Sequence, residues 1–218
     1  MIDESVEGML SEHEARVLGC LMEKQMTTPD YYPLTLNALT AACNQKSSRV
    51  PVMSLSSGEV GGVVNGLRGR GLVTARMDGR ADRFEHHLSR KLKLSSKERA
   101  VICVLMLRGA LTLNEIRINT GRMVTFEDTE ELQVLLEQLI GRDEPLLVQI
   151  PRTVGQREDR YAHLLCGEPE IEVAAKGMAG SPGGSKMESD RMLLLEKEVA
   201  DLKKEVQRLW ELTGLAKD

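Results

Sequence analysis

The feature that most constrains this chain is an internal repeat. LSEHEARVLGCLM (residues 10–22) and LSSKERAVICVLM (residues 94–106) share Leu, Ser, Glu, Val and Leu-Met at one constant offset. Both begin with Ser-x-x-Glu, the capping box in which each side chain bonds a backbone amide of the first helical turn. Apolar residues follow at helical spacing. A chain that starts the same helix twice is expected to build the same unit twice.

The similarity continues along both units. LTLNAL (34–39) matches LTLNEI (111–116), and each is predicted to start a second helix. A third helix is predicted within 56–73 and again within 129–148, because apolar residues recur there at matching helical positions. Each unit therefore contains three predicted helices in the same order.

Each unit then ends in a predicted β-hairpin, at 72–88 and at 146–165, where DRFEHHL matches DRYAHLL. Three helices followed by a hairpin is the element order of a winged helix-turn-helix domain. The predicted fold class is α+β and mostly helical, with two tandem winged helix-turn-helix domains plus a C-terminal amphipathic or coiled-coil helix.

The predicted boundaries follow from these patterns. We expect an N-terminal extension over 1–9, the first winged-helix domain over 10–91 and the second over 92–166. A Gly-, Ser- and Pro-rich composition predicts a flexible linker over 167–190. A coiled-coil-like helix is predicted over 191–215.

One stretch carries a family resemblance. EKQMTTPDYYPLTLNALTAACNQKSSRVPVMSLSSGEV (23–60) resembles the signature of the YceH family, a group of uncharacterised bacterial proteins built from two winged helices. The resemblance covers roughly residues 10–166, and NQKSSRVPV (44–52) is its most specific part. It implies the tandem fold and a bacterial cytoplasmic setting, but it implies no function.

Composition restricts the class of protein. Hydrophobic residues make up 41% of the chain and charged residues 28%, which is ordinary for a soluble globular protein. No apolar stretch approaches the ~18 residues of a membrane span, and the acidic start does not resemble a signal peptide. We expect a cytoplasmic protein without membrane contact. No C-x-x-C pair occurs, so we also expect no disulfides among the four cysteines, Cys20, Cys43, Cys103 and Cys166.

The C-terminal helix carries a seam typical of a parallel coiled-coil dimer. Its apolar residues recur at alternating spacings of three and four, at Met192, Leu195, Val199, Leu202, Val206 and Leu209. The pattern favours a homodimer. Because an isolated helix of this length is marginal in water, two alternatives stay open: packing on its own winged helices, and docking on another protein.

The third helix of the first domain, predicted over 56–70, is the candidate DNA reader. Asn65 and Arg68 are expected on its exposed face, where Asn can pair with adenine and Arg with guanine. The segment 10–91 has 11 Lys and Arg against 8 Asp and Glu, a net charge of +3. Basic residues around the helix are predicted to hold phosphates, namely Lys46, Arg49, Arg76, Arg80 and Arg83.

Five glycines interrupt this helix, and each costs about 0.8–1 kcal/mol of helix propensity relative to Ala. They are Gly58, Gly61, Gly62, Gly66 and Gly69. Two explanations are open. Tight packing between helices at Gly61 and Gly62 is the interpretation we favour, and close approach of the helix backbone to another surface is the alternative.

The matching helix of the second domain begins with TFEDTEEL (125–132), which holds four carboxylates and no basic residue. Carboxylates stabilise a helix N-terminus, but they would repel the phosphates of a DNA groove. We therefore predict that the second domain does not read DNA and instead binds a protein partner or forms a dimer.

No nucleotide-binding loop, hydrolase elbow or zinc-protease helix is present, and the histidines lack further metal ligands at local spacing. We expect no enzyme activity, cofactor or metal. The leading hypothesis is a regulator or accessory factor that contacts duplex DNA through its first domain. The main rival is a protein-interaction scaffold of tandem winged helices without DNA binding. A third option is an effector-sensing module with a ligand between the domains.

Overall fold

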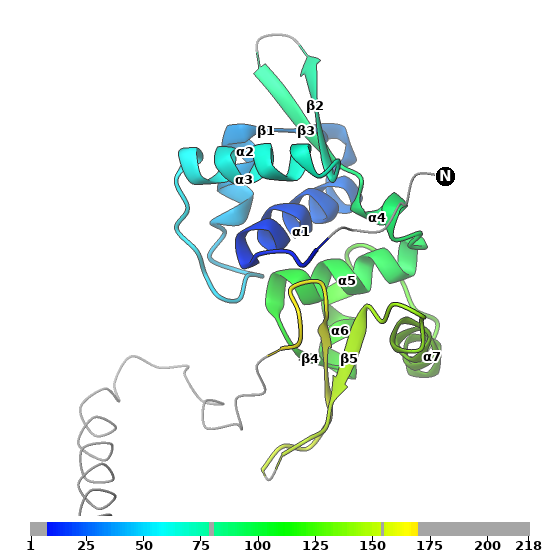
Figure 1. The fold of residues 1–218 in the computed structure, drawn as a ribbon. Coiled ribbons are helices and arrows are strands. Elements are labelled where there is room, and N and C mark those ends of the chain that lie inside the picture. Colours follow the sequence, from blue (N-terminus) through cyan, green and yellow to red (C-terminus); the bar gives the residue numbers. More distant parts are fainter. Residues whose placement is uncertain (1–7, 79–80, 154, 170–218) are drawn as a thin grey trace, which may run out of the picture. The chain divides into compact units, whose positions relative to one another are not determined.

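The computed structural model describes residues 8–78, 81–153 and 155–169 and has an α+β fold (Figure 1). The first repeat begins with a long helix and ends with a two-stranded hairpin. Its elements are α1 (Glu12–Thr27), a short 3₁₀ helix η1 (Pro29–Tyr31), β1 (Leu34–Thr35), α2 (Leu36–Cys43), α3 (Ser57–Gly69), β2 (Val73–Asp78) and β3 (Ala81–His86).

The second repeat has the same element order, after a short connecting helix α4 (Leu88–Lys91). Its elements are α5 (Ser96–Arg108), β4 (Leu111–Thr112), α6 (Leu113–Thr120), α7 (Thr129–Ile140), β5 (Leu147–Ile150) and β6 (Arg160–His163). The part of the chain described here therefore has seven α-helices and two antiparallel three-stranded sheets, in the orders β1-β3-β2 and β4-β6-β5.

The predicted helix starts need one correction. Leu34–Thr35 and Leu111–Thr112 were expected to be helical, but each pair forms a short strand beside the last strand of its repeat. Helices α2 and α6 begin two residues later than predicted because Thr35 and Thr112 are N-caps, whose hydroxyls accept bonds from the amides of Ala38 and Glu115. An N-cap keeps an extended backbone, so its strand pairing and its capping are compatible.

The predicted capping boxes are confirmed. Ser11 and Ser95 cap α1 and α5, and each accepts a bond from the glutamate three residues later while that glutamate accepts from the cap amide. Ser56 caps α3 in the same way. The acidic segment before α7 has a related role, because the Asp128 carboxylate accepts a bond from the Glu131 amide.

The two repeats share a core in which α1 packs against α5, as Figure 1 shows. Gly19 permits the close approach, because a Cβ there would lie 2.9 Å from a methyl group of Leu107. The Cys103 thiol donates to the Gly19 carbonyl across this interface, over 3.4 Å. The described residues of both repeats belong to one compact unit. The two hairpins, β2–β3 and β5–β6, extend from opposite ends of that unit (Figure 1).

One ion pair occurs at the same place in both repeats. Arg70, which follows α3, bonds Glu14 of the α1 capping box at 3.1 Å. Arg142, which follows α7, bonds Glu98 of the α5 capping box. Each pair ties the end of the third helix to the start of the first, so these arginines stabilise the fold.

Some predicted features fall beyond the described residues. The linker over 167–190 is described only in its first residues, and the coiled-coil-like helix over 191–215 is not described. The predicted dimer seam of Met192, Leu195, Val199, Leu202, Val206 and Leu209 thus lies outside the described residues. Among the helices that are described, none is long and apolar enough to cross a membrane.

Candidate functional site: the exposed face of α3 and its surroundings

Helix α3 has one buried face and one glycine-lined exposed face. Val60, Val64 and Leu67 lie in the core. On the opposite side, the exposed glycines follow spacings of four, four and three, which keeps them on one face of a helix. They are Gly58, Gly62, Gly66 and Gly69.

The structure contradicts the interpretation that Gly61 and Gly62 serve tight helix packing. A Cβ built at Gly62 would meet no atom of the described residues within 4 Å, and the same holds at Gly66 and Gly69. A Cβ at Gly61 would lie 3.7 Å from Leu36, an ordinary van der Waals contact. Packing among the described residues therefore does not explain why these positions are glycine.

The two predicted base-reading residues lie on exposed parts of the same helix. Arg68 donates from Nη1 to the Asn65 Oδ1, at a long distance of 3.4 Å. A weak bond of this kind holds the two side chains near each other without occupying their remaining donors and acceptors.

Arg49 is not a surface residue, and its predicted phosphate contact is corrected. Its guanidinium is fully buried and bonds both oxygens of Glu23, at 3.1 and 2.6 Å. Its Nε donates to the Ala42 carbonyl at 3.0 Å. Burial opposes ionisation of Glu23, but the bonds from Arg49 hold the pKa of that carboxyl below its usual value. Arg49 anchors the loop between α2 and α3 to α1, and no local sequence pattern indicated this pairing.

Arg83 has a structural contact that is repeated in the second half of the chain. Its Nη1 donates to the Pro33 carbonyl at 3.0 Å, and Arg160 donates to the Ala110 carbonyl at 2.9 Å. Each carbonyl immediately precedes the first strand of its sheet. The two arginines therefore fasten equivalent strands, and we leave Arg83 out of the candidate phosphate contacts.

The remaining basic residues of the first repeat are more accessible. Arg76 is 68% exposed on β2 and pairs with Glu85 of β3 at 2.9 Å. Lys46 is exposed on the loop between α2 and α3. Arg80 was also predicted to hold phosphate, and it lies outside the described residues. Lys46, Asn65, Arg68 and Arg76 thus stay in the candidate site.

The matching face of α7 has a different chemistry. Its exposed side chains are Glu130, Gln133, Val134, Glu137 and Gln138. Glu131 pairs with Lys97 of α5 and also accepts a bond from the Glu127 amide. Folding accounts for Asp128 and Glu131, whereas Glu130 and Glu137 face solvent.

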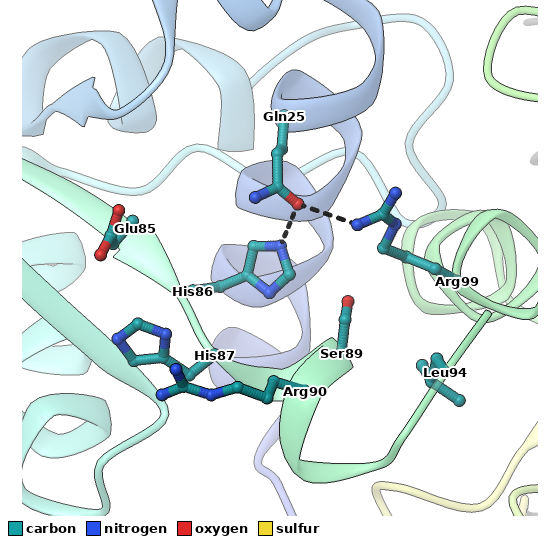
Figure 2. A pocket seen from close by; sticks show the side chains of 8 residues that line it. All are labelled: Gln25, Glu85, His86, His87, Ser89, Arg90, Leu94 and Arg99. Carbon is teal, nitrogen blue, oxygen red and sulfur yellow. Dashed lines mark hydrogen bonds between the residues drawn. The ribbon is translucent and has the colours of Figure 1, made fainter. Parts of the chain in front are cut away.

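A polar network joins the base of the β2–β3 hairpin to the second repeat (Figure 2). The Gln25 Oε1 lies 3.0 Å from His86 Nε2 and accepts from Arg99 Nη1 at 3.4 Å. Burial, with a smaller effect of Arg99, lowers the pKa of His86 to about 3. These groups and Ser89 line a pocket of about 360 Å³. No local sequence pattern indicated the link of His86 to Gln25 and Arg99.

A larger cleft of about 750 Å³ lies between the repeats. The C-terminal end of α1 and the loop between α2 and α3 form one wall, and α5 with the residues around the end of α6 forms the other. Four basic residues line it, namely Lys24, Lys46, Arg108 and Arg122. Only Lys46 among them was singled out from the sequence.

Comparison with known proteins places the chain in a family. Residues 10–156 match the family described as "Protein of unknown function, DUF480". A UPF0502 protein of Vibrio atlanticus is 46% identical, over 92% of this chain and 95% of its own length. UPF0502 proteins of Cellvibrio japonicus and Geobacter sulfurreducens are 45% and 44% identical, over 93% and 90% of this chain and 95% and 91% of their own lengths. The predicted resemblance to an uncharacterised bacterial family is confirmed.

Proposed function

The chain belongs to the DUF480 family, and we propose that it binds duplex DNA through its first repeat. In this proposal both repeats are winged helices. Helix α3 enters the major groove and the β2–β3 hairpin is the wing, which is the geometry of helix-turn-helix recognition. The second repeat supports the first and does not read DNA.

The observation that supports this proposal most is the exposed glycine face of α3. Glycine within a helix costs about 0.5–1 kcal/mol relative to Ala, and at Gly62, Gly66 and Gly69 no neighbouring atom requires it. A cost without a benefit among the described residues suggests that something beyond them approaches this face. A face without side chains lets a helix backbone approach a DNA surface closely.

The side chains around that face are of the types that bind the bases and phosphates of DNA. Asn65 and Arg68 lie where base edges would be met. Lys46 and Arg76 flank the helix from the loop and the wing, where they would neutralise phosphates. On α7 the position of Asn65 is taken by Glu137 and that of Arg68 by Ile140, so the second helix lacks both side chains that are proposed to read bases on α3.

Protein interaction is the second candidate function, because one exposed feature favours it. Val134 is 47% exposed in the middle of α7, flanked by carboxylates and glutamines. An apolar centre with a polar rim suits a protein interface. In the combined proposal a protein partner docks on the second repeat, and residues 191–215 pair two chains so that two α3 helices reach neighbouring half-sites.

The test is fluorescence anisotropy of a labelled generic duplex at about 50 and 200 mM salt. We expect Asn65→Ala/Arg68→Ala to lose roughly tenfold in affinity at the lower salt, because the variant lacks the Arg68 charge and attraction to phosphates dominates binding to a duplex of unselected sequence. The control is Glu137→Ala at the matching position of α7, which should bind like the wild type. Absence of duplex binding at the lower salt would refute the proposal and favour the scaffold.

A further inference from the structure

The cleft between the repeats has an excess of positive charge. Lys24, Lys46, Arg108 and Arg122 line it, and Glu23 is its one acidic lining residue. The Glu23 carboxylate is already bonded by the buried Arg49 and lies 3.3 Å from the Lys24 ammonium. It therefore does not neutralise the other cations, although the whole chain has a net charge of −4.

Arg108 is the most informative of these residues. It is half-buried at the end of α5, and no hydrogen bond or ion pair to it occurs within the described ranges. Burial and the nearby Arg49 lower the pKa of its guanidinium, against a smaller opposing effect of Glu23. A half-buried cation near a second cation is unfavourable unless an anion compensates it.

The walls of the cleft are held in place by the fold. The Val50 amide donates to the Leu107 carbonyl at 2.8 Å, which ties the loop between α2 and α3 to α5. Arg16 is also buried and donates to the Pro51 carbonyl at 2.6 Å. This anchoring holds Ser47 and Ser48 at the cleft wall, where their hydroxyls can donate hydrogen bonds.

We propose that the cleft between the repeats binds a small phosphate-bearing polyanion. Its volume of about 750 Å³ is within the range of pockets that enclose small ligands. Three cations without an ion pair within the described ranges, Lys46, Arg108 and Arg122, suit an anion with several charges. Arginines and hydroxyls together are the groups that recognise phosphate oxygens.

The cleft is a better candidate for a ligand site than the smaller pocket of Figure 2. In that smaller pocket, the side-chain atoms His86 Nδ1, Ser89 Oγ and Arg99 Nε are buried and have no hydrogen-bond partner among the described residues. The cleft instead offers accessible charged groups from both repeats. A bound anion would connect Lys46 of the first repeat with Arg108 and Arg122 of the second.

Isothermal titration calorimetry of the full chain with inorganic pyrophosphate tests the proposal without DNA. We expect saturable binding at one site, at least tenfold weaker in Arg122→Gln and in Arg108→Gln. Arg117→Gln, an exposed substitution on α6 outside the cleft, is the control and should bind like the wild type. Arg122 is exposed, so its substitution keeps the test valid even if Arg108→Gln unfolds.

Two results would overturn the proposal. One is the absence of saturable pyrophosphate binding, or binding that both cleft substitutions leave unchanged. The other is citrate binding as tight as that of pyrophosphate, which would show a response to charge and not to phosphate. Because no duplex is present, neither result depends on whether the first repeat binds DNA.

Discussion

The two repeats have the same order of α-helices and strands, but the exposed faces of their third helices differ in chemistry. Helix α3 exposes glycines with Asn65 and Arg68, whereas α7 exposes carboxylates, glutamines and Val134. Both helices keep the same buried stripe and the same capped start. The shared features are those that folding needs, and the differences are confined to the face that folding leaves free. That face is where the functions of the repeats are expected to diverge.

The same comparison separates structural arginines from candidate ligand-binding ones. Arg70 and Arg83 have counterparts in Arg142 and Arg160, which make equivalent contacts. Arg68 and Arg76 have none, because Ile140 and Ile150 occupy the matching positions. A basic residue that recurs with its contact stabilises the fold, and one that occurs only once is a better candidate for function.

The largest expected effect concerns the loop between α2 and α3, which is longer than the matching loop before α7. Arg49→Ala should lower the free energy of unfolding by about 3 kcal/mol, because it leaves the Glu23 carboxylate buried without its main partner. Urea unfolding at neutral pH measures this loss. The paired substitution Glu23→Gln/Arg49→Met should lose less. If the Arg49→Ala variant instead lost duplex affinity at unchanged stability, Arg49 would be a DNA contact and not a structural residue.

A smaller effect is expected from the histidines that end the third strands. Burial, with Arg99 and His87, lowers the pKa of His86 to about 3, and burial alone lowers that of His163 to about 4. An unfolded chain takes up these protons near pH 6.5. Stability should thus be unaffected above that pH and should fall below it, because the unfolded state binds protons first.

Each histidine should contribute about 1.4 kcal/mol of lost stability per pH unit between about pH 6.5 and its folded pKa. Urea unfolding at pH 7 and pH 5 measures the difference, which is roughly 2 kcal/mol for one residue. His86→Phe should remove the part of this pH-dependent loss of stability that His86 contributes, and His163→Phe the part that His163 contributes. A pH dependence that survives in the double variant would contradict the assignment.

The smallest of these effects tests whether the repeats are structurally equivalent. Arg83→Ala and Arg160→Ala should each lower the free energy of unfolding by at least about 1 kcal/mol, because each variant loses at minimum the hydrogen bond that its arginine donates to a carbonyl. The two losses should be similar, and duplex affinity should stay unchanged in both variants. A fall in affinity for Arg83→Ala alone would show that the first wing also uses this residue for phosphate.

The sequence predicted features that depend on residues near one another. The capped helix starts and the buried stripes follow from the spacing of nearby residues, so the order of the elements could be predicted from the sequence. The burial of Arg49 was not, because its partner Glu23 lies on α1 and no local pattern joins them. The role of the glycines in α3 could not be predicted from the sequence either. Only the structure shows that a Cβ at Gly62 or Gly66 would meet no atom of the described residues within 4 Å.

The most direct test of the central claim uses those glycines. Gly62→Ala/Gly66→Ala should raise the free energy of unfolding by about 1–2 kcal/mol in total, because alanine favours the helix and the added methyl groups meet no atom. The same variant should bind a labelled duplex at least tenfold more weakly, since the methyl groups keep the α3 backbone from the DNA. Val134→Ala/Gln138→Ala at the matching positions of α7 should leave duplex binding unchanged. A more stable variant with undiminished duplex affinity would contradict the claim that this face binds DNA.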